Sequence, residues 1–338
     1  MTRALLLIAA LAATPALAIF GIETDPDKIE EGWKKEKLEA LASDRDPKER
    51  AAAAKWLGGR DDPEAVSALA AALSDPDARV RQAAASGLWS TGKKAASARP
   101  QLEKALDDSD ANVVARVTGA LEATGMKEAE LVAPNRRVFN APEATIDSRF
   151  LVSRNLIGRE PNARILDAQL AYLADNASSK SRAGQHNTGI AKEALEYLVK
   201  KTQDPALGPP LLEAARTARA GQPEILHAIA QLKAKPPGLA QVAVQLCDSP
   251  DRDVRYAALG AMRTLTTKSD VDIWAPRAAA LLHDPESLVR VQAATALGYG
   301  AGLAAAHVDA VVEALHDSSG SVRRDAAEIG RASCRERV

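Results

Sequence analysis

The chain has 338 residues, of which 46% are hydrophobic and only 3% aromatic, and its formal net charge is −1. This apolar content excludes a chain that is disordered throughout. Without a basic excess or many aromatic residues, the composition also gives no basis for nucleic-acid binding. The apolar residues are mostly Ala, Leu and Val, which favours close-packed helices.

Residues 1–18 have the pattern of a secretory signal peptide: Arg3, a run of Leu, Ile and Ala, and then Ala16-Leu17-Ala18. We expect cleavage after Ala18 and a periplasmic or secreted protein; the alternative is a buried N-terminal helix. The run is too short for a transmembrane helix and no second long apolar run follows, so we predict no membrane span.

Residues 19–43 are predicted to form an N-terminal cap. Asp25 and Pro26 give a helix start within 24–43. The residues expected to pack this helix against the next element are Ile29, Trp33, Leu38 and Leu41.

A repeat then runs through the chain. Its copies lie at 73–88, 106–121, 246–262, 282–298 and 315–327, with a weaker copy at 44–58. They align on a column of valines: Val80, Val113, Val254, Val289 and Val322. A repeat of about 33 residues indicates a solenoid. We predict such repeats over 44–131 and over 205–327.

Each copy predicts a pair of helices. An Asp-Pro or Asp-Ser cluster ends one helix and caps the next. In the first helix of each pair, apolar residues recur at i, i+4 and i+8, as at Val80, Ala84 and Leu88. Second helices follow, at 61–73 and 307–315 for example. Two helices cannot hide both apolar faces, so neighbouring pairs must stack. The predicted fold is all-α: a right-handed α-solenoid of stacked antiparallel helix pairs.

The pattern D-x-D-x-x-V-R-x-x-A-x-x-x-L resembles the short HEAT-like repeats of phycobilisome lyase-related proteins, over roughly 41–125 and 238–327. This resemblance implies the solenoid architecture. It also implies an alternative function, a chromophore lyase-like or other enzyme-associated HEAT protein.

An arginine follows the valine in most copies, at Arg81, Arg255, Arg290 and Arg323, with Arg50 at the matching place in the first copy and Val114 in the third. In HEAT-like repeats this arginine pairs with an aspartate of a neighbouring unit. Since Asp75, Asp77, Asp108 and Asp110 recur at matching spacing, we favour a structural ladder. The alternative is an anion-binding stripe.

The middle of the chain, 132–204, lacks the motif and is predicted to be an irregular helical region. The segment 132–147 has the residues of a Pro-interrupted loop, and helices are expected near 147–157, 162–174 and 189–202. The polar stretch 175–189 is predicted to be a mobile surface loop; the alternative is a partner-binding insertion with Lys180, Arg182 and His186. Two interpretations of this region stay open: degenerate repeats, or a break in the solenoid.

No motif points to catalysis. The five histidines, His186, His227, His283, His307 and His316, lack the His-Glu motif by which HEAT-like deoxyhypusine hydroxylases bind iron. Cys247, His283 and His316 occupy one column, but stacked repeats would place them ~8–10 Å apart. A metal site needs distances near ~2 Å. We therefore expect no catalytic, cofactor or metal residues, and the binding residues stay unknown.

The tryptophans are the large anchors: Trp33, Trp56, Trp89 and Trp274. Trp56 and Trp89 lie near the ends of first helices, where they either pack at the turn or form a recognition patch. The favoured function is a monomeric, non-catalytic scaffold that binds a protein or peptide, with second helices lining its concave face. A regulatory domain of a longer protein is a further alternative.

The last residues, 328–338, are predicted to be non-native. After Val322 and Ala326 the i+8 position holds Gly330 instead of Leu or Met. Back-translation of Ile329–Val338 gives a sequence similar to a short-read sequencing adapter, which would remove Cys334 and leave Cys247 without a disulfide partner.

Overall fold

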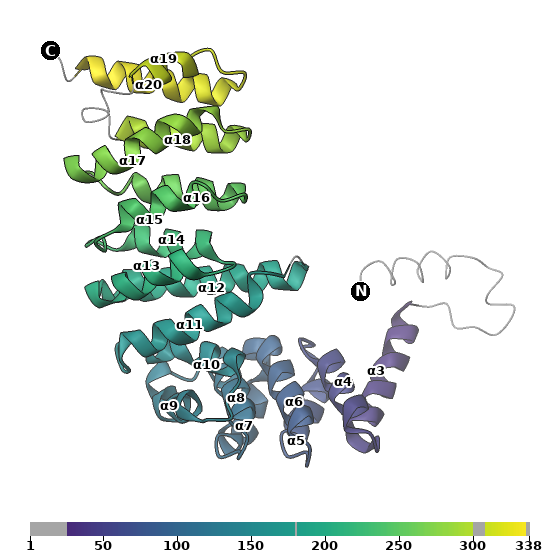
Figure 1. Cartoon of the computed structure of the whole chain (residues 1–338). Helices are drawn as coiled ribbons and strands as arrows, with labels where there is room; N and C mark the ends of the chain where they lie inside the picture. Colours follow the sequence, from purple (N-terminus) through teal and green to yellow (C-terminus); the bar gives the residue numbers. More distant parts are fainter. Residues whose placement is uncertain (1–25, 180, 300–307, 336–338) are drawn as a thin grey trace, which may run out of the picture. The chain divides into compact units, whose positions relative to one another are not determined.

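The computed structural model describes residues 26–179, 181–299 and 308–335 (Figure 1). Within these ranges the chain is helical and has no β-strand; an isolated bridge joins Ile157 and Glu160. The chain divides into two compact units, Met1–Leu156 and Ile157–Val338. The predicted all-α fold is therefore confirmed.

The first unit consists of helices joined by short turns. Its α-helices are α3 (Pro26–Ser43), α4 (Pro47–Leu57), α5 (Pro63–Ala72), α6 (Ala78–Thr91), α7 (Arg99–Ala105), α8 (Ala111–Ala123), α9 (Val132–Asn140) and α10 (Ile146–Ser153). Short 3₁₀ helices are η1 (Gly92–Ala98), η2 (Glu128–Leu131) and η3 (Arg154–Leu156).

The second unit continues the same pattern. Its α-helices are α11 (Asn162–Asn176), α12 (Arg182–Thr202), α13 (Gly208–Thr217), α14 (Gln222–Gln231), α15 (Leu239–Leu246), α16 (Arg252–Met262), α17 (Lys268–Ala280), α18 (Ser287–Tyr299), α19 (Val308–Ala314) and α20 (Gly320–Arg335). Its 3₁₀ helices are η4 (Pro205–Leu207) and η5 (Leu281–His283).

Helices within each unit form two layers (Figure 1). In the first unit α4, α6, α8 and α10 pack side by side, and α3, α5 and α7 form the other layer. In the second unit α12, α14, α16, α18 and α20 make up one layer, while α13, α15, α17 and α19 make up the other. Each unit is thus a stack of helix pairs, an α-solenoid.

The two layers of the first unit differ in how closely their helices pack. Neighbours among α4, α6 and α8 contact one another far more extensively than α5 contacts α3 or α7. A stack of pairs curves toward the layer whose helices are closer together. We therefore call α4, α6 and α8 the inner layer of this unit; that the second helices line a concave face stays a prediction.

The predicted apolar stripes form the core. Each stripe is buried along its length: Val80, Ala84 and Leu88; Val113, Val117 and Leu121; Val254, Ala258 and Met262; Val289, Ala293 and Leu297. Val322 and Ala326 of α20 are buried as well. Burial of these side chains between neighbouring pairs is the main stabilising interaction of the stack.

The aspartates start the helices as the sequence predicts. The Asp77 carboxylate accepts a hydrogen bond from the backbone N–H of Arg79, and Asp46 does the same for Lys48. Asp110 accepts from the N–H groups of both Asn112 and Val113. These contacts satisfy donors that have no partner within the helix.

The middle region is more regular than predicted. The segment expected to be a loop at 132–147 contains α9, because Pro134 lies in the first turn, where a missing N–H breaks no helical hydrogen bond. The predicted loop 175–189 is wrong as well. α12 begins at Arg182 and places Arg182 and His186 on a helix; Lys180 lies outside the described residues.

Two predictions concern the ends of the chain. The predicted signal peptide, 1–18, lies outside the described residues. At the other end the backbone is helical as far as Arg335. The non-native origin of 328–338 stays a prediction.

Candidate binding face

An arginine–aspartate ladder joins consecutive repeats. Arg50 donates to Asp75 through Nε and Nη2, at 2.8 and 2.9 Å. Arg81 contacts Asp108 in the same two-point manner, at 2.6 and 2.9 Å. The second unit repeats this geometry in two pairs, Arg255 with Asp284 and Arg290 with Asp317. In all four pairs the arginine belongs to one repeat and the aspartate to the next, so the predicted ladder is confirmed.

Each ladder arginine is also tied to its own repeat. Nη1 of Arg81 donates to the carbonyl oxygens of Asp75 and Pro76, at 2.9 and 3.1 Å. Arg255 and Arg290 make the equivalent contacts to the loops before their own helices. These groups are bound to protein atoms on both sides, which argues against the anion-binding stripe.

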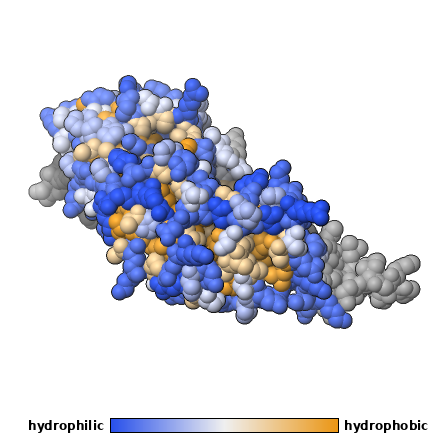
Figure 2. Space-filling model, turned by 90° about the horizontal axis from the view of Figure 1, so that it is seen from below, coloured by the Kyte–Doolittle hydropathy of each residue, from blue (hydrophilic) through white to orange (hydrophobic). Residues whose placement is uncertain are grey.

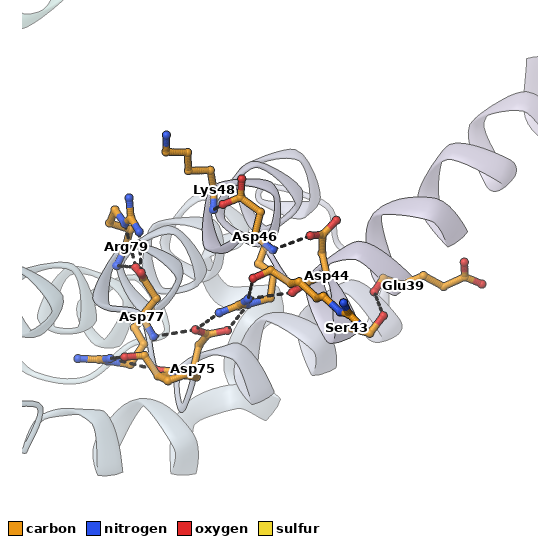
Figure 3. Close-up of polar contacts among 12 residues, drawn as sticks. Glu39, Ser43, Asp44, Asp46, Lys48, Asp75, Asp77 and Arg79 are labelled. Atoms are coloured by element: carbon orange, nitrogen blue, oxygen red, sulfur yellow. Dashed lines mark hydrogen bonds and ion pairs between the residues drawn. The ribbon is translucent and has the colours of Figure 1, made fainter.

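The two aspartates in each of the clusters 75–77 and 108–110 have separate tasks. The first binds the preceding arginine and accepts from the backbone of the second: Asp75 accepts from the N–H of Asp77 at 2.8 Å (Figure 3). The second caps the helix. The hydrogen bond from Arg50 lowers the pKa of Asp75. For Asp108, burial alone would raise the pKa, but the hydrogen bonds from Arg81 and from the N–H of Asp110 together lower it.

The cysteine–histidine column holds no assembled metal site. Cys247 is buried, and burial raises the pKa of its thiol to about 12, so no thiolate forms near neutral pH. His283 and His316 are exposed and line a cavity of about 230 Å³, where Nε2 of His283 lies 3.7 Å from Oε2 of Glu313. In the described ranges no group of three or more His, Cys, Asp or Glu side chains is placed to hold a metal ion.

The tryptophans separate into packing and exposed residues. Trp274 is buried, and its Nε1 donates to the carbonyl oxygen of Leu265. Trp33 is half-buried, and so is Trp56, whose ring is covered by the Arg60 guanidinium at 3.7 Å. Trp89 differs, with 40% of its surface exposed on the inner layer. Trp56 and Trp89 both lie near the ends of first helices, but their environments differ.

Trp89 of α6 packs against α8, and three cations of α4 and α8 have no ion-pair partner among the described residues. Its ring lies against Gly119 of α8, with ring atoms 3.6–3.9 Å from where a Cβ would stand. Arg116 is one turn before Gly119 on the same helix and is half-buried. Lys48 and Lys55 are exposed on α4. Among the residues that the structure describes, none of these three cations forms an ion pair.

Small and polar residues separate these groups. We call the set Lys48, Ala52, Lys55, Gln82, Ser86, Trp89, Arg116 and Gly119 the basic face. All of its members are exposed or half-buried on α4, α6 and α8. Adjacent helices in such a layer are ~8–10 Å apart, so the face can contact an extended segment at several points. The sequence repeats located the helices, but only the structure showed which side of them faces out.

The helix spacing under this face depends on two glycines. A Cβ on Gly58 would stand 2.7 Å from the Cα of Gly87, and one on Gly87 would meet both Gly58 and Leu69 at 3.1 Å. The N–H of Gly59 also donates to the carbonyl oxygen of Gly87, at 3.3 Å. Close approach of α4 and α6 therefore requires the absence of side chains here.

The face in Figure 2 carries hydrophobic residues in several separated patches with hydrophilic residues between them. No helix in the described part of the chain is long and apolar enough to cross a bilayer.

Comparison with known proteins agrees with this architecture. Residues 36–122, which contain the basic face, match the family model of HEAT repeats. This segment is therefore similar to HEAT repeats, the class of helical repeat that its sequence pattern resembles. No curated protein matches the chain.

Solved structures share the fold. A crystal structure of an engineered protein is 20% identical, with a TM-score of 0.53, and the match covers 98% of this chain and 94% of the other. The karyopherin Kap121p bound to the extreme C-terminus of a protein phosphatase is 14% identical, with a TM-score of 0.49. That match covers 90% of this chain and 38% of the karyopherin, so the chain spans well under half of its length.

Proposed function

We propose that this chain is an exported, non-catalytic scaffold that binds a protein segment on the basic face of its first unit. The observation that carries the proposal is Trp89, an exposed aromatic residue that packs against Gly119, one helical turn after Arg116. Trp and Arg are the residue types that contribute most to binding energy at protein interfaces. Export rests on the signal-peptide pattern of residues 1–18.

The partner favoured by this face is an extended segment with acidic side chains and at least one apolar group. Lys48, Lys55 and Arg116 supply positive charge, and no carboxylate of the described residues forms an ion pair with them. Trp89 supplies an apolar surface, and Gln82 and Ser86 supply polar contacts between the cations. Charges of this kind raise association rates and select against basic partners.

The alternative of a chromophore lyase-like protein has no support from Cys247. A thiol that is buried and has a pKa of about 12 cannot attack or hold a bilin. Purified chain that carried or transferred a bilin would nevertheless establish that function.

The test compares two variants of opposite predicted effect. Chain purified from periplasm is used to capture proteins from periplasmic extract, and each captured protein is quantified. Three forms are compared: the wild type, the double variant Trp89→Ala with Arg116→Glu, and the single variant Lys104→Glu. Lys104 lies exposed on α7, in the other layer, and so provides a matched charge control. We expect the double variant to lose a specific partner by at least ~10-fold, while Lys104→Glu retains it.

Two results would contradict the proposal. One is equal capture by the wild type and the double variant. The other is a chain found only in the cytoplasm after fractionation, since the proposed partner would then be in the wrong compartment.

A further inference from the structure

The face at the α20 end of the second unit is built like an internal interface. Arg323 occupies the ladder position on α20, after Val322. Its Nη1 donates to the carbonyl oxygens of Asp317 and Ser318, at 2.7 and 3.0 Å. Arg290 makes the matching contacts to Asp284 and Pro285, at 2.8 and 3.1 Å. Arg323 is therefore held in the ladder geometry by its own repeat.

The carboxylate half of this rung is missing. The four paired arginines have side chains that are between 11 and 14% exposed. Arg323 is exposed, and no carboxylate of the described residues pairs with it. Two carbonyl contacts already hold this guanidinium in place. It therefore loses little further conformational freedom when it binds a carboxylate, which favours that binding.

The apolar side chains of this end face are also more exposed than their equivalents inside the stack. Leu315 follows α19 and is 37% exposed, whereas the equivalent Leu73 and Leu282 are each 4% exposed. Val312 is 50% exposed, whereas Ala279, at the equivalent position of α17, is 8% exposed. The internal residues are covered by the helix pair that follows them in the stack.

We propose that this end face, made by Val312, Leu315 and Arg323, takes one further helix pair of the same type, supplied by the same polypeptide. An aspartate before the second helix of that pair completes the rung with Arg323. Arginine and aspartate of the four rungs are 25, 27, 29 and 27 residues apart. The aspartate therefore belongs 25–29 residues after Arg323.

The sequence from Glu328 to Val338 does not supply such a pair. It contains no aspartate, and Gly330 stands where α6, α8 and α18 have Leu88, Leu121 and Leu297. The start of the solenoid is no substitute either, because α3 already covers α4 and α5 there. A second copy docked head to tail would find that position occupied.

The test adds the missing pair from the chain's own sequence. Residues 328–338 are replaced by a copy of 295–327, which keeps the register and places a copy of Asp317 27 residues after Arg323, as in the Arg290 rung. Arg323→Ala and Asp317→Asn in the copy alone are made singly and together. Chemical unfolding is measured for each, and hydrogen exchange reports whether the added helices are folded.

We expect the extended chain to be more stable, with its added helices protected. Arg323→Ala should raise the unfolding equilibrium constant by roughly tenfold in the extended chain but less than about twofold in the original one. The two substitutions should be non-additive, and Arg290→Ala with Asp317→Asn should behave in the same way at the internal rung. Additive effects, or an unprotected copy, overturn the proposal.

Two other measurements keep the proposal testable if the extended chain does not fold. An independently sequenced gene should encode an aspartate 25–29 residues after Arg323, followed by a valine–arginine helix; a continuation without it overturns the proposal. Sedimentation of the original chain tests a second copy: a dimer that Arg323→Glu dissociates would show that the occupant is another chain.

Discussion

The repeats α4–α8 and the middle helices α9–α12 both bury apolar side chains, but their polar contacts differ. In α4–α8, paired aspartates cap the helices and complete the rungs with Arg50 and Arg81. In α10, Arg149 donates to the carbonyl oxygens of Ala141 and Pro142, at 2.7 and 3.0 Å, but the described residues give it no carboxylate. Stacking thus requires the buried apolar stripe, and the ladder adds register and stability to a stack that forms without it.

The first prediction tests whether the two regions share one source of stability. Leu121 of α8 and Leu195 of α12 are both fully buried. Each change to Ala should cost about 3 kcal/mol, because it leaves a cavity in close-packed helices. Denaturant unfolding of both variants measures this; a cost at Leu195 below about 1 kcal/mol would show that the middle region is loosely packed.

The second prediction tests whether an arginine with a carboxylate partner contributes more to stability than one without. Arg81→Ala should cost about 2–3 kcal/mol, because it leaves the partly buried Asp108 carboxylate without its partner. Arg149→Ala removes hydrogen bonds to carbonyl oxygens alone and should cost about 1 kcal/mol. Equal costs in the same unfolding assay would mean that the carboxylate adds nothing to the ladder.

The third prediction concerns helix spacing. Gly58→Ala should cost about 2 kcal/mol, because the new methyl group would overlap Gly87 and push α4 from α6. Gly189→Ala in α12 has open space around it and should stabilise by about 0.5–1 kcal/mol. Thermal unfolding distinguishes the two; a stable Gly58→Ala chain would contradict the close approach.

The smallest effect is on pH dependence. Because the pKa of Asp108 is lower in the folded chain, the unfolded chain binds its proton more readily. The stabilisation is complete above the unfolded pKa of about 3.9 and is lost as pH falls toward the folded value. Asp108→Asn should therefore be less stable than wild type at pH 7, with a shallower decline between about pH 5 and 3. Parallel curves would contradict this.

Particular residues show what the sequence could predict. The valine column, the aspartate caps and the arginine ladder were found because each uses a residue type at a fixed spacing. The predicted loop at 175–189 is wrong because a polar composition does not exclude a helix. Ser181 caps that helix by accepting from the N–H of Gly184, and its later turns bury Leu195, Leu198 and Val199.

The basic face could not be predicted for a different reason. Val80, Ala84 and Leu88 mark the buried side of α6, but which of the remaining sides faces solvent depends on the neighbours of the helix. Gly58 and Gly87 determine that neighbour contact, and nothing in their local sequence marks them as a pair.

The unequal layers also have a mechanical consequence. In the first unit the inner helices are in close contact and linked by ladder rungs, while α5 makes few contacts with α3 and α7. Bending the unit therefore mainly changes the spacing between the helices of the layer that contains α3, α5 and α7. The distances between Lys55, Trp89 and Arg116 change least in such a motion, so the unit can flex and still present a partner with a constant spacing of contacts.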